Sequence, residues 1–345
     1  MKVGIAVGGS LQEVVALAGR AEATGLESIW LAELDHSAFV QAAAAISATS
    51  RIGVGTAVAL AFPRSPTVTA MTAWDLDELS GDRFMLGLGP QVKRVLEARF
   101  SVRVDKPAPQ MREYVRAVRT IWAANRGESV VHQGEFYKIT MPTFHGPPRP
   151  ERRDTPILLA AVGPVLSRVC GEVADGLIGH PLASPRFLRE AVWPAVLAGL
   201  DLAGRPGGAC PITAMPMVSI GDDEDAARRA ARLQIAFYAT TPSYKPILAL
   251  HDRGALPRDL RRAFVERDRD RMASLIDDEL LDSIAIAGRP DEAPDRLRAW
   301  EGVADRVILG VPWYGMDAGR QRQAIEAALE LGARVAAERP AVPSR

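Results

Sequence analysis

The chain has 345 residues, of which 48% are hydrophobic and 24% are charged, and this composition excludes a disordered chain and allows one large core. Its 42 acidic and 42 basic side chains balance, so no global basic field attracts nucleic acid or an acidic membrane surface. We therefore expect a small molecule as the partner, with no nucleic acid and no membrane.

Short apolar segments alternate with helical patterns along the chain, starting with MKVGIAVGG, whose apolar run is too short for a signal peptide. The segments with strand character are, in chain order, Lys2–Val7, Ser28–Leu31, Ile52–Leu60, Phe84–Leu88, Pro156–Ala161, Gly176–Gly179, Ile212–Ile220 and Arg306–Leu309. Strands that are apolar on both faces are typical of parallel sheets covered by helices. Eight such units favour an α/β fold, the (β/α)8 TIM barrel, whose usual size is about 250 residues.

The helix before the fourth strand has clear signals at both ends. Ser65 can cap free amides, Pro66 suits a first turn, and Gly81 supplies the backbone freedom of a helix end. Apolar residues recur in between at helical spacing and are expected to share one face: Met71, Trp74, Leu76 and Leu79.

The length beyond a minimal barrel predicts insertions in a single domain that spans residues 1–345. The first covers about residues 100–150, after the fourth strand, with a helix over Met111–Ala124 and a hairpin VVHQGEFYKI that turns at Gln133-Gly134. The second covers about residues 240–290, after the seventh strand, and its charged segments predict helices. Helices carried on loops in this way often serve as lids.

A doubly wound sheet is the competing fold, and it would carry a phosphate-binding GxGxxG motif after a strand. The segment Gly87–Val92 has the first two glycines, but Val92 stands where the third should be. The barrel is therefore the preferred fold.

The two cysteines, Cys170 and Cys210, have no CxxC spacing and no histidine cluster near them. The sequence thus predicts neither a disulfide framework nor a zinc site, and a reducing cytoplasm is the expected location. No segment reaches the roughly 18 apolar residues of a membrane span. The acidic run Asp222–Asp225 starts a helix, where acids favour the dipole, so we expect no metal site there.

In such barrels the active site lies where the strands end, at their carboxyl ends. Asp35 and His36 follow the second strand in AELDH, and a histidine can give or take a proton near neutral pH. The alternative is a solvated pair, with Asp35 capping the next helix. His180 follows the sixth strand and has two possible roles, one in the pocket and one in packing beside Pro181. VPWYG follows the eighth strand.

A second kind of site lies in AAVGPVLSRV, where Gly163-Pro164 opens a helix directly after a strand. Free amides near Val162 to Val165 could hold a phosphate there without a basic side chain. The alternative is an ordinary helix start.

Three segments carry a family resemblance. They are LAELDH after the second strand, GTAVALAFPRSPTVTAMTAWDLDELSGDRFMLGLG across the third and fourth, and AAVGP with CGEVADGLIGHP across the fifth and sixth. Together they resemble the bacterial luciferase-like flavin and deazaflavin oxidoreductases, and the branch most resembled uses coenzyme F420, a deazaflavin. The resemblance covers most of the chain and is weakest from about Thr241 to Ser283.

The resemblance implies that a planar redox ring stands in the barrel mouth, backed by a cis peptide bond at Ala57-Val58. Residues expected at the ring edge are Ala59, Leu60, Gly87, Gly89 and Gln91. The phosphate is expected on Ala161, Val162, Gly163 and Pro164, with Gly179 and His180 nearby. His36 matches a histidine that lies by the reactive carbon in related dehydrogenases, so His36 and Asp35 are the expected catalytic residues.

Departures from the family pattern shape the expected reaction. Related dehydrogenases carry a glutamate after the fourth strand, where this chain has Pro90-Gln91, and an amide cannot accept a proton as a carboxylate does. They also have an acid where Gly8-Gly9 stands and a tryptophan where Val40 stands. We therefore expect an F420-dependent oxidoreductase that transfers a hydride to an organic acceptor, with an activated C=C or C=N bond favoured over alcohol oxidation.

Two alternatives remain open: an FMN-dependent monooxygenase of the same fold, and a noncatalytic cofactor-binding protein. The F420 tail is acidic, and basic residues expected near the mouth favour it: Arg64, Lys93, Arg94 and Arg186. Because relatives are often dimers, a homodimer is expected.

Overall fold

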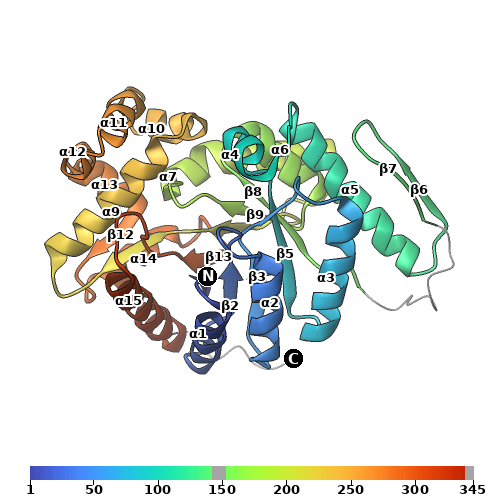
Figure 1. The fold of residues 1–345 in the computed structure, drawn as a ribbon, viewed down its shortest axis with the longest axis horizontal. Helices are drawn as coiled ribbons and strands as arrows, with labels where there is room; N and C mark the ends of the chain where they lie inside the picture. The colour runs from blue at the N-terminus through green and yellow to red at the C-terminus, as the bar shows by residue number, and fades with distance from the viewer. Residues whose placement is uncertain (142–152, 339–345) are drawn as a thin grey trace.

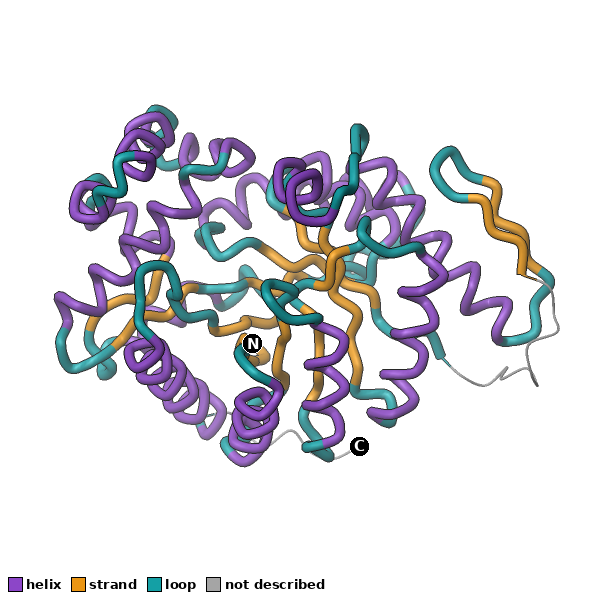
Figure 2. Tube along the Cα trace, in the orientation of Figure 1, coloured by secondary structure: helices purple, strands orange, loops and turns teal. Residues whose placement is uncertain are grey.

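The computed structural model describes residues 1–141 and 153–338. Its centre is a closed barrel of parallel strands surrounded by helices, and it confirms the predicted (β/α)8 fold (Figures 1 and 2). The barrel strands are β1 Lys2–Val7, β2 Ser28–Leu31, β3 Gly53–Thr56 with its continuation β4 Ala59–Leu60, β5 Phe84–Gly89, β8 Ile157–Ala161, β9 Gly176–Gly179, β10 Ile212–Ala214 and β13 Arg306–Leu309. They follow one another around the barrel in this order, and β13 pairs with β1 to close it.

The helices follow the strands and pack on the outside of the barrel (Figure 1). They are α1 Leu11–Ala23, α2 Ala38–Ser47, α3 Pro66–Ser80, α4 Lys93–Phe100, α5 Pro107–Asn125, α6 Pro164–Val173, α7 Pro185–Phe187, α8 Trp193–Leu202, α9 Glu224–Ala239, α10 Lys245–Leu250, α11 Leu256–Val265, α12 Arg269–Ser274, α13 Asp278–Ile284, α14 Ala293–Leu297 and α15 Ala318–Ala337. Within the described residues, no helix is both long and apolar enough to cross a membrane.

Helix α3 begins and ends at the predicted residues, but its buried face differs from the prediction. Ser65 accepts a hydrogen bond from the Val68 amide at 3.3 Å, and Gly81 is left-handed with φ 62°. Met71 and Leu79, expected on the same face as Trp74, are more than half exposed.

The face of α3 that is buried consists mainly of small side chains, such as Thr69, Ala70 and Ala73. The large rings of α5 pack against this face and leave room only for small side chains. Trp122 donates a hydrogen bond to the Ala70 carbonyl at 3.0 Å, and the Tyr114 hydroxyl lies 2.6 Å from the Thr69 hydroxyl. Small residues on one helix therefore admit aromatic residues of the next. The spacing of large apolar residues missed this arrangement.

The predicted seventh strand, Ile212–Ile220, is broken in the structure. Only β10 belongs to the barrel, and the chain resumes as β11 Met217–Ile220, which pairs in parallel with β12 Ala285–Gly288 in a separate sheet. Pro216 lies at the break, where a residue without an amide proton interrupts a ladder. The strand β12 was not predicted.

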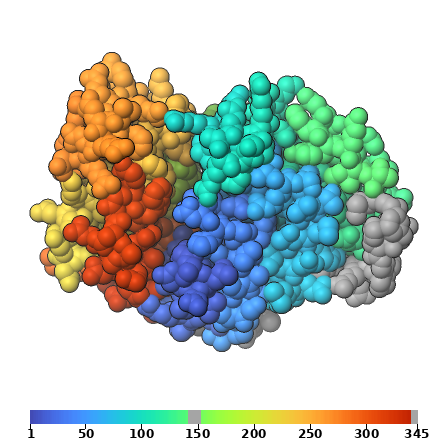
Figure 3. Space-filling view, in the orientation of Figure 1, coloured from blue at the N-terminus to red at the C-terminus, as the bar shows by residue number. Residues whose placement is uncertain are grey.

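Between β5 and β8 the chain forms α4, α5 and an antiparallel hairpin, β6 Val130–Gln133 with β7 Lys138–Met141, as the hairpin pattern predicted. The carboxylate of Glu113 on α5 fixes the turn by accepting the amides of Phe136 and Tyr137 at 3.0 and 2.7 Å. Residues 142–152 of the expected first insertion lie outside the described part of the chain. Between β10 and β13, helices α10 to α13 form a group that stands at the same end of the molecule as α4 (Figures 1 and 3).

The barrel interior is closed by a layer of large side chains around Trp30. Trp30 packs with Leu158, Ile178 and Ile308, all at most 4% exposed. Two glycines make room for the indole, since a Cβ atom at Gly55 would lie 2.4 Å from it and one at Gly4 would lie 3.0 Å from it. We call this layer the Trp30 floor.

Candidate active site

Above the Trp30 floor, the inner wall of the barrel consists mostly of small side chains that solvent can reach. Ala6, Ala57, Val58, Ala160 and Met215 pack against the floor and remain partly exposed. The residues beside them along the strands, such as Ile5 and Leu159, point to the outer core and are fully buried. Four of these five side chains are alanine or valine, so this layer, at the carboxyl end of the barrel that we call the barrel mouth, is built mainly from small residues.

One wall of the mouth is the turn that joins β3 to β4. The Ala57-Val58 peptide bond is cis, as the resemblance implied. The turn is attached to β2, because the Ala57 amide donates to the Leu31 carbonyl at 2.8 Å and the Glu33 amide to the Val58 carbonyl at 3.1 Å.

The same turn is attached to β5 by a side chain. The regular pairing of β3 with β5 ends at Gly55 and Met85, and beyond it the Thr56 hydroxyl accepts the Gly87 amide at 2.9 Å and donates to the Gly87 carbonyl at 2.7 Å. The glycines of β5 allow this contact, since a Cβ atom at Gly87 would lie 1.7 Å from the Thr56 carbonyl oxygen. A Cβ atom at Gly89 would lie 2.5 Å from a methyl carbon of Val58.

A buried ion pair supports this wall from behind. The Glu33 carboxylate, 9% exposed, accepts the Leu60 amide at 2.8 Å and binds the Arg64 guanidinium through both oxygens. Arg64 also lies over the Phe39 ring, 5.1 Å from its centroid. The Glu33 carboxylate thus neutralises the charge of Arg64. Arg64 is therefore no longer among the basic residues expected to attract an acidic cofactor tail. Sequence reasoning gave Glu33 no role.

Asp35 and His36 lie exposed on the loop between β2 and α2. Arg99 of α4 donates to the Leu34 carbonyl and lies 3.5 Å from Asp35. Asp35 does not cap α2, because Ser37 occupies the capping position and no side chain bonds there.

The loop after β1 lies close to His36. The pKa of Glu13 is lowered mainly by hydrogen bonds from Ser10, and the charge of His36 contributes a smaller lowering. His36 is therefore near the first turn of α1 at the rim of the mouth.

Gln91, expected at the ring edge, is turned toward its own backbone. It has a left-handed backbone with φ 60°, and its side-chain oxygen accepts the Val92 amide at 2.9 Å. This arrangement holds the start of α4 and gives no proton acceptor in place of a carboxylate.

The start of α6 leaves backbone amides without a partner inside the helix. Gly163 caps the helix without a side-chain hydrogen bond, Pro164 is its first residue, and the first-turn amides of a helix have no partner within it. A Cβ atom at Gly163 would meet nothing within 4 Å, so the approach is open. The register pairs Ala161 with Gly179, which brings the expected phosphate residues of β8 and β9 side by side.

His180, directly after β9, lies within a group of aromatic rings. Its ring is 4.0 Å from that of Tyr244 and 4.9 Å from that of Tyr238, measured between centroids. Burial lowers the pKa of His180 to about 3, and its Nδ1 accepts the Leu182 amide at 3.1 Å. The imidazole is therefore neutral at pH 7 with its proton on Nε2.

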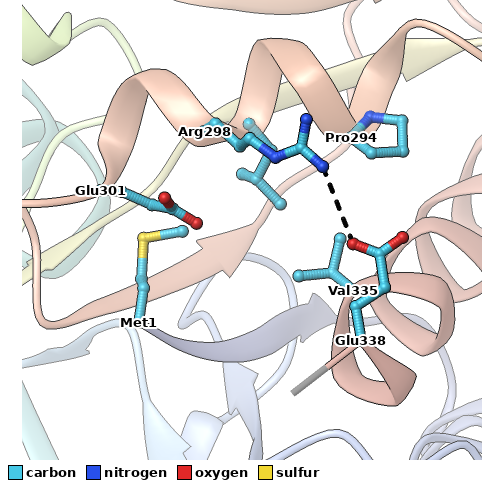
Figure 4. A pocket seen from close by; sticks show the side chains of 7 residues that line it. Met1, Pro294, Arg298, Glu301, Val335 and Glu338 are labelled. Atoms are coloured by element: carbon cyan, nitrogen blue, oxygen red, sulfur yellow. Dashed lines mark ion pairs between the residues drawn. The ribbon is translucent and has the colours of Figure 1, made fainter. Parts of the chain in front are cut away.

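Two other observations concern the molecule outside the barrel mouth and its metal-binding capacity. A small hollow lined by Met1, Arg298, Glu301 and Glu338 lies at the opposite end of the barrel, where the strands begin (Figure 4). Within residues 1–141 and 153–338, no group of histidine, cysteine, aspartate or glutamate side chains is placed to hold a metal ion.

Comparisons with proteins of known sequence agree with this architecture. The chain is 41% identical over 295 residues to an uncharacterized protein of Mycobacterium tuberculosis, covering 83% of this chain and 86% of that one. It is 29% identical over 301 residues to a 5,10-methylenetetrahydromethanopterin reductase of Archaeoglobus fulgidus, covering 85% and 87%.

Solved structures share the fold. The coenzyme F420-dependent tetrahydromethanopterin reductase of Methanopyrus kandleri superposes with a TM-score of 0.79 at 22% identity, covering 96% of this chain and 97% of that one. A Baeyer–Villiger monooxygenase of Pseudomonas putida in complex with FMN superposes with a TM-score of 0.67 at 17% identity, covering 97% and 98%. Solved structures with this fold therefore include a coenzyme F420-dependent reductase and an FMN-bound monooxygenase.

The family resemblance inferred from the strand-end segments is confirmed by a match of residues 2–306 to a family model. The chain belongs to the luciferase-like monooxygenase family.

Proposed function

We propose that the protein is an F420-dependent oxidoreductase that transfers a hydride between the reduced deazaflavin and an organic acceptor. The observation that carries the proposal is the accessible layer of small side chains above the Trp30 floor, beside the Ala57-Val58 turn. Such a layer would offer a planar tricyclic ring a flat apolar surface to lie on. The reductases among the relatives favour reduction over oxygenation.

The residues that would hold the cofactor fall into two groups. The ring would lie against the turn at Ala57, Val58, Ala59 and Leu60 with Gly87, Gly89 and Gln91 at its edge. The phosphate would lie at Ala161, Val162, Gly163 and Pro164, near Gly179 and His180, where first-turn amides supply donors. When bound, the reduced cofactor supplies the hydride and leaves oxidised.

The acceptor that we favour is an activated C=C or C=N bond, which gains a hydride at one end and a proton at the other. Gln91 cannot take a proton from an alcohol, so alcohol oxidation lacks its base. His36, exposed at the rim beside Asp35, is our proposed source of the proton. Replacing His36 by Asn should lower turnover and leave the cofactor affinity unchanged, and unchanged turnover would remove this role.

The alternative cofactor is FMN, which would make the protein a monooxygenase, and its support is the FMN-bound neighbour. A noncatalytic cofactor-binding protein is a second alternative, supported by the missing glutamate at Pro90-Gln91. The deciding experiment titrates the purified protein separately with F420 and with FMN and follows the fluorescence of each. Oxygen uptake with reduced cofactor then separates an oxygenase from a reductase, and the absence of turnover with any acceptor would favour the noncatalytic alternative.

We also propose a single domain over residues 1–345, a cytoplasmic location and a homodimer. The two free, buried cysteines agree with a reducing compartment. Three apolar side chains on the outer face of α3 support the dimer, since Val68, Met71 and Leu79 are each more than half exposed. Replacing Met71 and Leu79 by Lys should shift the protein toward monomer in analytical ultracentrifugation.

A further inference from the structure

Four aromatic side chains from four separate segments converge at the barrel mouth, and we call them the aromatic arc. His180 follows β9, Tyr238 lies on α9, Tyr244 ends the short 3-10 helix Pro242–Tyr244, and Trp313 follows β13. His180 contacts both tyrosines, and the Trp313 Nε1 atom donates to the Tyr238 hydroxyl at 3.4 Å. None of the four is completely buried, and Trp313 is 37% exposed.

The arc lies across the barrel from the Ala57-Val58 turn. Around the barrel, β3 is the third strand and β10 the seventh, so these two strands are diametrically opposite in a closed set of eight. The arc residues flank β10, because His180 follows β9 on one side of it and Trp313 follows β13 on the other. A molecule between the proposed ring and the far wall of the mouth would therefore touch the arc.

The arc carries no charged side chain at neutral pH. Its histidine is neutral because burial lowers the pKa of His180 to about 3. At the ends of β10 and β13, the partly exposed residues between the rings are Met215, Gly310 and Val311. A carboxylate bound against the faces of Tyr244 and Trp313 would lose its hydration without gaining a cation from the arc, so this surface disfavours a carboxylate.

Two polar groups of the arc carry a proton that could be donated to a ligand. His180 carries its proton on Nε2, since Nδ1 already accepts the Leu182 amide. The Tyr238 oxygen accepts from Trp313, which leaves its own proton free to donate. A ligand that matches these donors carries a carbonyl oxygen or another neutral acceptor.

We propose that the aromatic arc binds the reducible substrate as an uncharged, planar, conjugated molecule with a carbonyl acceptor, an aromatic or cyclic enone being the type. The rings supply stacking surface, and the donors orient the carbonyl. This inference rests on the proposed function, because it places the substrate on the open face of the proposed cofactor ring. It assigns specificity to Tyr244 and Trp313, which belong to neither of the two proposed groups of cofactor-binding residues.

The test compares two probes that share a phenyl-propenyl frame and differ in charge. Benzalacetone is an uncharged enone, and cinnamate carries a carboxylate in place of the methyl ketone. Equilibrium dialysis against the protein, loaded with the oxidised form of whichever cofactor binds, should show benzalacetone bound at least tenfold more tightly. Tyr244→Ala and Trp313→Ala should each weaken benzalacetone about tenfold, while Tyr244→Phe, which keeps the ring, should stay within about threefold.

Controls separate this inference from the proposed function and from loss of folding. Tyr137→Ala removes a ring from the β6–β7 hairpin, at the opposite edge of the molecule from α10 to α13 (Figure 1), and should leave probe affinity unchanged. Cofactor titrations on the same variants should give the affinity of the parent. Failure to bind either cofactor would end the proposed function, and dialysis on the chain alone would still report on the arc. Equal affinity for cinnamate, or alanine variants that bind benzalacetone like the parent, would overturn the inference.

Discussion

On the β2–β5 side of the barrel mouth, a buried ion pair and a threonine hydroxyl join neighbouring strands, whereas the β9–β13 side is walled by aromatic rings from four separate segments. The first wall is rigid because each contact crosses between adjacent strands. The second wall depends on α9 and the residues after it, and its rings meet without a network of ion pairs. The difference suits a fixed geometry for a cofactor on one side and a more adaptable surface for a substrate on the other.

The largest effect that we expect comes from filling the closest approach in the rigid wall. Gly87→Ala would place a Cβ atom 1.7 Å from the Thr56 carbonyl oxygen, a backbone atom that cannot move alone. We expect the free energy of unfolding to fall by about 3 kcal/mol. Gly19→Ala is the matched control, because Gly19 lies exposed on α1 with no atom within 4 Å of the new carbon. Urea denaturation measures both, and equal stabilities would show that the wall can relax.

The next effect concerns the ion pair behind that wall. Glu33→Ala leaves the Arg64 guanidinium half-buried without its partner and the Leu60 amide without its acceptor, so we expect a loss of about 3 kcal/mol. Glu33→Gln keeps an acceptor for the Leu60 amide and should lower the free energy of unfolding by less. Cofactor affinity should fall in the same order, since Leu60 belongs to the turn that would back the ring.

The control for this pair is Arg186→Ala, which breaks an exposed ion pair with Glu190 and should change stability by no more than about 0.5 kcal/mol. Denaturation curves are compared across the set, and cofactor titrations are compared between the Glu33 variants and the parent. A Glu33→Ala variant that loses stability yet binds cofactor like the parent would separate the ion pair from the function of the turn.

On the aromatic side, the expected effect is a dependence on pH. The pKa of His180 is lowered from 6.5 to about 3 by burial, so between these values the unfolded chain binds a proton that the folded protein does not. Stability should therefore fall as the pH is lowered through this window, by at most about 1.4 kcal/mol per pH unit. His180→Asn should flatten the curve of unfolding free energy between pH 6.5 and 4. A variant curve parallel to that of the parent would mean that His180 becomes protonated without cost.

The difference between the two walls also decides what the sequence could predict. The β3–β4 turn, the glycines of β5 and the start of α6 lie within short segments with recognisable patterns, and the structure places Ala57-Val58 and Gly163-Pro164 at the barrel mouth as expected. The aromatic arc could not be predicted, because Tyr238 and Tyr244 carry no local signal and meet His180 only through the fold. For Trp313 the sequence indicated the position, because VPWYG follows the eighth strand and strand ends face the barrel mouth.

Missed contacts on the rigid side have a similar cause. Glu33 was visible after the second strand, but its partner Arg64 lies 31 residues away, and only the turn between β3 and β4 brings the two together. The buried face of α3 was predicted wrongly because Ala70 and Thr69 contact the aromatic rings of α5. Which face of α3 is buried therefore depends on the side chains of α5. Local periodicity reports the size of side chains and cannot report what they pack against.

The smallest effect compares two serines that occupy the same position in two helices of the rigid side. Ser65 caps α3 and accepts the Val68 amide, whereas Ser37 stands at the cap of α2 without a side-chain hydrogen bond. Ser65→Ala should therefore lower the free energy of unfolding by about 0.5 to 1 kcal/mol, and Ser37→Ala should change it by less. If both substitutions lower the free energy of unfolding equally, Ser37 stabilises the start of α2 as much as Ser65 stabilises the start of α3. The loop that carries Asp35 and His36 would then be firmly held. If Ser37→Ala leaves the free energy of unfolding almost unchanged, the loop that carries Asp35 and His36 is less constrained than the segment before α3. Such freedom suits a proton donor that must approach a bound substrate.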